Sequence, residues 1–381
     1  PPWVAALNEE AIPTKRLGSK WTCGLSAQTI KERTTVPRVL GAHIPPGFGL
    51  AFPHTVGAEP TVANYAAFTY TPDANEFVFE TAQRAVAAES LGKDDVPDVL
   101  TINLSSNDYI GHGFGPYSAQ AVDMMVRTDA QLASFLAFLD KSVGAGKYLF
   151  VLTSDHGVSP IPEDAGAPEM GVHAGRFSVK EVVGQVHAAL TARFGPPAGG
   201  SWFALAEGDA PTGSPVQGGT FLDGMMYFSP AAVRAVLAAD RKLSRRDLEQ
   251  TACDAINGSG IPGVYGCYGR TQILEGRTAD TTLHRHLAMG VHPQLSADLI
   301  VLQEQLCLHD PLVEPHAAAH GTPYAYDTHV PVVLYQPGLI KAGVFGGRVT
   351  PMDIAPTVSL LVGVEFPSGC DGDPLTPALA R

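Results

Sequence analysis

Short apolar runs alternate with amphipathic stretches along much of the chain. Residues 98–105 (D-V-L-T-I-N-L-S) and residues 148–154 (Y-L-F-V-L-T-S) are apolar runs of strand length. Between them, apolar side chains recur near helical spacing from residue 118 to residue 143, and Gly144 and Gly146 end that pattern. This alternation predicts an α/β fold with a mostly parallel central sheet flanked by helices. Further strands are expected at residues 297–303 and 330–335, and a short helix at residues 353–362.

Residues 157–293 have a different composition, rich in Gly, Pro and polar side chains. The spacing of their apolar residues still predicts three helices, at residues 178–194, 230–240 and 244–257. In the last of these, Ser244 and Asp247 fit a capping box. We interpret the stretch as an insertion or cap within a single domain over residues 1–381. It is expected above the carboxyl edge of the sheet, where loops shape access to a site.

Composition and charge exclude several classes of protein. The chain has 381 residues, 45% of them hydrophobic, which is ample material for a folded core. Its net charge of −13 argues against a nucleic-acid binder held by phosphate contacts and against a polybasic membrane-surface protein. No apolar run reaches the roughly 18 residues of a membrane span. No feature of the sequence indicates an oligomeric state.

Five cysteines occur, none in a C-x-x-C pair, so they cannot be a disulfide framework. Cys253 and Cys267 could form one bridge, which would suit an oxidising compartment; the alternative is that all five are unpaired, partly buried thiols. The chain starts Pro1-Pro2 with neither Met nor a signal-peptide pattern, so we expect residue 1 to be a product of processing or truncation.

Chemistry-bearing side chains follow the predicted strands, and ligands collect at the carboxyl ends of strands in α/β sheets. Asp108 and His112 come four residues apart after the first strand. Asp155 and His156 form an Asp-His-Gly sequence after the second, and His320 begins a His-Gly pair ahead of the strand at 330–335. Carboxylate oxygen and imidazole nitrogen together suit zinc or a similar divalent ion.

A single tetrahedral zinc with one open position needs fewer ligands than these two Asp and three His, and two such zinc ions need more. The count therefore indicates a two-metal site that lacks one ligand. Each pattern alone is also common in ordinary turns and on solvated helices. Their joint occurrence at three strand ends favours function. Of the remaining histidines, four have no partner at ligand spacing: His43, His54, His173 and His187. The sequence around Gly144 and Lys147 lacks the residues of a phosphate-binding loop.

Four motifs resemble one known family. They are S-S-N-D-Y-I-G-H-G-F-G-P-Y-S (residues 105–118), L-T-S-D-H-G (152–157), A-H-G-T-P-Y-A-Y-D-T-H-V-P-V-V-L-Y (319–335) and R-V-T-P-M-D-I-A-P-T (348–357). Together they resemble the bacterial alkaline phosphatases of the Thr-nucleophile, type I phosphodiesterase/nucleotide pyrophosphatase-like branch of the alkaline phosphatase superfamily. The resemblance covers most of residues 60–381 and is weaker in the insertion.

The resemblance implies a two-zinc phosphate-monoester hydrolase acting on small phosphorylated substrates. Asp108, His112 and His320 would hold the zinc that activates the attacking water. Asp155 and His156 would hold the other, about 4 Å away. The family's nucleophilic Thr, one Asp ligand and its phosphate-binding Asn, Lys and Arg correspond to positions upstream of Pro1.

The missing positions imply an N-terminally incomplete domain that is inactive by itself, with phosphoryl transfer through a covalent intermediate on a nucleophile outside the chain. The family's usual export implies a periplasmic or secreted protein. Two other interpretations stay open. One is a phosphodiesterase, nucleotide pyrophosphatase or sulfatase-like hydrolase on the same metal frame. The other, of a different class, is a non-catalytic metal-binding fragment.

Overall fold

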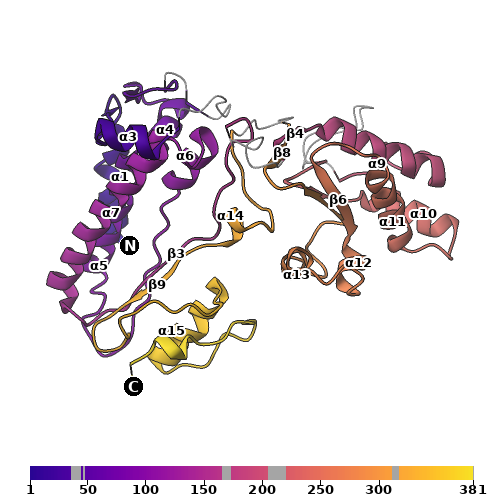
Figure 1. Ribbon diagram of the computed structural model, residues 1–381. Helices are drawn as coiled ribbons and strands as arrows, with labels where there is room; N and C mark the ends of the chain where they lie inside the picture. Colours follow the sequence, from indigo (N-terminus) through magenta and orange to yellow (C-terminus); the bar gives the residue numbers. More distant parts are fainter. Residues whose placement is uncertain (36–43, 46–47, 165–172, 205–219, 311–316, 381) are drawn as a thin grey trace. The chain divides into compact units, whose positions relative to one another are not determined.

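The computed structural model describes residues 1–35, 44–45, 48–164, 173–204, 220–310 and 317–380 (Figure 1). The chain divides into two compact units. The first consists of Pro1–Val36, Ile44–Val158 and His329–Arg381, and the second contains Ser159–Thr328. The second unit therefore begins close to the expected start of the insertion and extends past its expected end at residue 293.

The first unit is mainly helical in its described residues. A π-helical turn, Asp140–Gly144, continues the longest helix, and two 3-10 turns lie near the C-terminus, Pro351–Asp353 and Thr376–Ala378. The α-helices are α1 (Pro2–Glu9), α2 (Ile12–Lys15), α3 (Ala27–Arg33), α4 (Val62–Thr69), α5 (Pro72–Ala88), α6 (Ser106–Phe114), α7 (Ala119–Leu139) and α15 (Ile354–Val362).

Helices α5 and α7 lie side by side (Figure 1), and aromatic side chains pack between them. Phe79 of α5 and Phe135 of α7 are buried, with ring centroids 5.3 Å apart. Helix α7 begins where the sequence predicts, because the Ser118 hydroxyl accepts a hydrogen bond from the Ala121 amide at 3.1 Å. Gly144, at φ 121°, ends the helical stretch. The helix predicted at residues 118–143 is confirmed.

The strands of the first unit pair differently from the expected sheet. Strands β1 (Lys20–Trp21) and β2 (His54–Thr55) are antiparallel. So are β3 (Phe150–Thr153) and β9 (Val332–Tyr335), whose register runs from Phe150 opposite Tyr335 to Thr153 opposite Val332. The strands predicted at residues 148–154 and 330–335 are thus present, but a mostly parallel sheet is not formed among the described residues. The apolar residues of a strand do not indicate whether the strand paired with it runs parallel or antiparallel.

Residues 98–105, predicted as a buried strand, form no ladder with another segment. Val99 is 73% exposed. Ile102 and Leu104 instead pack against the buried cluster around Phe79 and Phe135. The apolar pattern that suggested a strand therefore comes from side-chain packing against α5 and α7, and this prediction is wrong.

Among its described residues, the second unit contains two small sheets and the remaining α-helices. Strands β4 (Gly175–Phe177) and β8 (Cys307–His309) pair in parallel. Strand β7 (Leu299–Gln303) lies between β5 (Met225–Met226) and β6 (Val264–Gly269) and is antiparallel to both. The helices are α9 (Val179–Phe194), α10 (Pro230–Ala239), α11 (Arg245–Asn257), α12 (Arg270–Leu274), α13 (Thr282–Met289) and α14 (Ala325–Thr328).

The core of the second unit lies between its three-stranded sheet and its helices. Helix α11 packs against both α9 and β6 (Figure 1). Val186 of α9, Leu248 of α11 and Leu299 of β7 are buried in one cluster. Ser244 and Asp247 form the expected capping box at the start of α11. The three helices predicted in this stretch and the strand predicted at residues 297–303 are confirmed.

A disulfide joins Cys253 of α11 to Cys267 of β6, which settles the open alternative for this pair. The two cysteines are 14 residues apart, and closing a loop of that size stabilises a folded protein by about 3 kcal/mol.

We expect the double substitution Cys253→Ala and Cys267→Ala to lower the free energy of unfolding by about 2–4 kcal/mol in urea titrations. Cys23→Ala is the matched control, and equal stability with and without reductant would contradict the prediction.

Candidate metal centre

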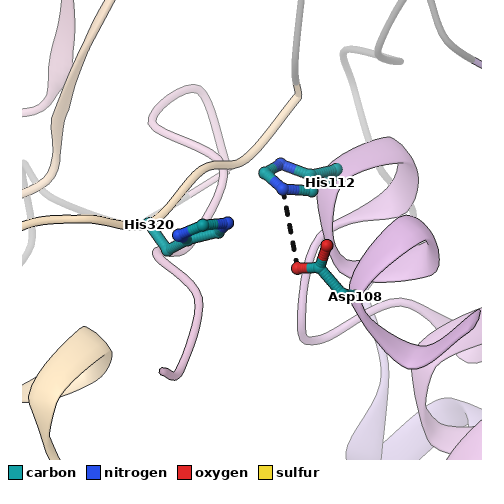
Figure 2. Close-up of side chains that lie close together, drawn as sticks. All are labelled: Asp108, His112 and His320. Atoms are coloured by element: carbon teal, nitrogen blue, oxygen red, sulfur yellow. Dashed lines mark ion pairs between the residues drawn. The ribbon is translucent and has the colours of Figure 1, made fainter. Parts of the chain in front are cut away.

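Helix α6 places Asp108 and His112 on one face, because residues four apart are neighbours on a helix. His112 Nε2 lies 3.5 Å from Asp108 Oδ1 (Figure 2). Both side chains are partly shielded, with 16% of His112 and 37% of Asp108 exposed. Asp108 is in the first turn of the helix, where the aligned peptide dipoles favour a negative charge. The pair offers an oxygen and a nitrogen donor to one cation.

Buried packing on other sides of α6 fixes its position. Ile110 and Phe114 are almost fully buried. A Cβ on Gly111 would lie 3.5 Å from the Val158 side chain, so the segment that follows Asp155 and His156 packs directly against this helix. His54, whose ring lies 5.3 Å from that of Phe114, hydrogen bonds through Nδ1 to the Phe48 carbonyl at 2.7 Å. Burial lowers the pKa of His54, which is a structural residue.

Asp155 and His156 follow β3 in a loop stabilised by its own hydrogen bonds. His156 Nδ1 lies 2.8 Å from the Gly157 carbonyl oxygen, which only accepts, so Nδ1 carries the proton. This fixes the tautomer in which Nε2 bears the lone pair, as in histidines that bind metals. Nε2 lies 3.6 Å from Asp155 Oδ2, and the His156 amide donates to Asp155 Oδ1 at 3.1 Å.

His320 belongs to the second unit. Its neighbour Ala319 is held by two hydrogen bonds to Ser159, one from the Ser159 amide to the Ala319 carbonyl at 2.8 Å and one from the Ala319 amide to the Ser159 hydroxyl at 3.2 Å. Within this unit, His320 lines a cavity of about 50 Å³ with His309, whose Nε2 lies 3.4 Å from Asp223 Oδ1.

The structure therefore brings the predicted ligands together as two local pairs, Asp108 with His112 and Asp155 with His156. The assembly of these pairs and His320 into two metal sites stays a prediction, as does the placement of residues 157–293 above the edge of a sheet. His43 and His316, two of the remaining histidines, lie outside the described residues.

Comparison with known proteins identifies the class of fold. Residues 25–181 match the family model of type I phosphodiesterase/nucleotide pyrophosphatase. The crystal structure of wild-type alkaline phosphatase PafA superposes with a TM-score of 0.79 at 28% identity, covering 100% of this chain and 66% of that one. The chain thus has an alkaline phosphatase-like α/β fold, which confirms the fold class predicted from the sequence, although the strand pairs of the described residues are mostly antiparallel.

Two curated relatives show which branch of the superfamily the chain resembles. Alkaline phosphatase PafA of Elizabethkingia meningoseptica is 28% identical over 385 residues, covering 100% of this chain and 64% of the relative. Alkaline phosphatase PhoV of Synechococcus elongatus is 25% identical over 379 residues, covering 100% and 62%. The chain spans less than two thirds of the length of either relative. These matches confirm the resemblance to the alkaline phosphatase-like branch of the alkaline phosphatase superfamily.

In the described part of the chain, none of the helices has the length and apolar character that crossing a bilayer requires.

The sequence analysis missed another group of donor side chains. His173, Glu304 and Cys307 come together in the second unit, each with a ligand atom within 4.8 Å of the others. His173 is more than one hundred residues from the other two, so no local spacing could have indicated the group.

Proposed function

We propose that this chain is the metal-holding part of a phosphoric-ester hydrolase of the alkaline phosphatase type, with small phosphate monoesters as substrates. The observation that carries the proposal is the Asp108–His112 pair. The two side chains occupy one face of α6, 3.5 Å apart, within the motif that resembles the family's metal-binding segment. The relatives named alkaline phosphatases support the reaction class.

The donor set of this site fits zinc. Asp108 and His112, with His320, are proposed to hold one ion, and Asp155 and His156 contribute to the other. Two bound metal ions would supply charge neutralisation for an in-line displacement at phosphorus. The carboxylates of Asp108 and Asp155 and the imidazoles of His112, His156 and His320 would hold the ions in place. The cations also offset the negative charge that this acidic chain would present to a phosphate.

The connectivity of the chain supports the assignment of His320 to the same ion as His112. Val158 packs against Gly111, the residue before His112. Ser159 hydrogen bonds to Ala319, the residue before His320. Val158 and Ser159 are joined by one peptide bond, which spans only about 3.8 Å between Cα atoms. His112 thus directly follows Gly111, which contacts Val158, and His320 directly follows Ala319, which is hydrogen bonded to Ser159.

Phosphoryl transfer is proposed to proceed through a covalent intermediate on a Thr or Ser outside these 381 residues. We therefore expect the 381-residue chain by itself to bind metal without enzyme-like turnover. The Cys253–Cys267 disulfide supports a periplasmic or secreted setting, because disulfides persist in oxidising compartments.

The proposal can be tested by comparing the hydrolysis of different substrates by the protein that the natural gene encodes. The substrates to compare are p-nitrophenyl phosphate, bis-p-nitrophenyl phosphate and p-nitrophenyl sulfate, each with and without added zinc after chelation. We expect the highest kcat/KM for the monoester, lost on chelation and restored by zinc. A preference for the diester or the sulfate would favour the rival hydrolases. Metal binding without hydrolysis of any of the three would favour a non-catalytic metal-binding protein.

A further inference from the structure

Three donor side chains of different chemistry, none of them part of the four motifs, converge in the second unit. His173 Nδ1 lies 3.4 Å from Cys307 Sγ and 3.5 Å from Glu304 Oε2. All three ligand atoms lie within 4.8 Å of one another. An imidazole, a thiolate and a carboxylate are each established zinc ligands, and the nitrogen–sulfur combination selects for borderline and soft cations over Mg²⁺ or Ca²⁺.

The backbone that carries the donors is well fixed. Glu304 follows β7 directly and Cys307 begins β8, and the Cys307 amide donates to the Glu304 carbonyl at 3.1 Å to close the turn between them. The Glu304 amide donates to the Gly263 carbonyl at 2.9 Å. Leu306 completes the turn at φ 63°, a conformation that places Glu304 and Cys307 close together.

His173 reaches the same point from another part of the chain. Strand β4 pairs in parallel with β8, and Gly175 is the register partner of Cys307. The His173 ring lies over Gly175, where a Cβ would sit 3.6 Å from the ring carbon Cε1. The parallel pairing therefore holds the imidazole against the thiol. Because the donors come from two paired strands and a tight turn, little conformational entropy remains to be lost on binding an ion.

The surroundings favour an added cation. Cys307 is buried, while the side chains of His173 and Glu304 are 59% and 43% exposed, so an ion has a route from solvent to the thiol. A divalent cation would offset the negative charges of the Glu304 carboxylate and the Cys307 thiolate, and the thiol would release its proton to solvent on binding.

We propose that His173, Glu304 and Cys307 form a binding site for one divalent cation of the zinc class. Three protein ligands leave a fourth tetrahedral position for water or a further donor. The bound ion would connect β4 to the turn between β7 and β8, and so stabilise the second unit by mass action. The site shares no residue with the motifs, so this proposal does not rest on the proposed hydrolase function.

Cobalt(II) titration of the metal-free 381-residue chain tests this site. The motif residues include no cysteine, so a thiolate-to-cobalt charge-transfer absorption distinguishes a thiol site from the motif ligands. We expect the absorption to appear as cobalt is added, to be displaced by zinc, and to be absent in Cys307→Ser. The other two free thiols provide matched controls, and Cys23→Ser and Cys370→Ser should keep the absorption.

Cys307 is buried, so its substitution could unfold the second unit. The partly exposed ligands provide a second measurement: His173→Ala and Glu304→Gln should each weaken cobalt binding by at least about tenfold while far-ultraviolet circular dichroism stays unchanged. A His112→Ala variant should retain the absorption, which separates this site from the motif ligands. The proposal is overturned if the unsubstituted chain shows no thiolate–cobalt absorption, or if binding is unaffected in His173→Ala and Glu304→Gln.

Discussion

His112→Ala is expected to remove one zinc ion from the chain and to lower turnover of phosphate monoesters by more than about 100-fold. Loss of a partner that only orients a metal ligand already costs about 10–100-fold in affinity or activity, so loss of a ligand should cost more. The substitution leaves Asp108 as the one remaining donor of the α6 pair. Zinc content after dialysis measures the first effect on the 381-residue chain. Hydrolysis of p-nitrophenyl phosphate measures the second on the naturally encoded protein.

The control for this substitution is His187→Ala. His187 lies on α9 in the second unit and belongs to neither donor group, so zinc content and turnover should not change. His112 lies opposite buried Ile110 on a short helix, and retained circular dichroism would show that α6 and its packing survive. Unchanged zinc content in folded His112→Ala would contradict the assignment of Asp108 and His112 as ligands, whatever the activity.

Features that depend on local sequence were predictable. Helix α7 has both a helical apolar spacing and a Ser118 cap, and α11 has the Ser244–Asp247 capping box. The Asp108–His112 pair was predictable for the same reason, because a separation of four residues on a helix fixes which side chains are neighbours. In these cases the interaction that decides the structure lies within a few residues of the pattern that predicts it.

Features that depend on distant partners were not predictable. The direction of the β3–β9 pairing is set by two segments about 180 residues apart, and neither run of apolar residues encodes it. The apolar residues at 98–105 pack against helices instead of joining a ladder. The group of His173, Glu304 and Cys307 exists only because β4 and β8 pair in register. Strand periodicity reports burial of a face, and many arrangements can bury the same face.

Asp298→Ala is expected to destabilise the second unit by about 3–5 kcal/mol, the usual cost of removing one partner from a buried ion pair. The Asp298 side chain is 2% exposed. Its carboxylate accepts hydrogen bonds from the Phe228 amide at 2.7 Å, from Arg245 Nη2 at 2.9 Å and from Arg270 Nη2 at 3.3 Å. The alanine variant would leave the buried Phe228 amide without this acceptor and Arg270, 14% exposed, without its counter-charge.

Amide hydrogen exchange isolates this effect to the second unit. Exchange of the most protected amides of α11 and β7 should accelerate by about a hundred-fold to a few thousand-fold, since each 1.4 kcal/mol corresponds to a factor of about ten. Asp280→Ala is the matched control: it also removes a carboxylate paired with an arginine, but Asp280 is 91% exposed, and such surface pairs contribute at most about 1 kcal/mol. Protection in α5 and α7 of the first unit should not change in either variant. Similar exchange rates in Asp298→Ala and Asp280→Ala would show that water or backbone movement replaces the lost carboxylate, and that this ion cluster does not hold the second unit together.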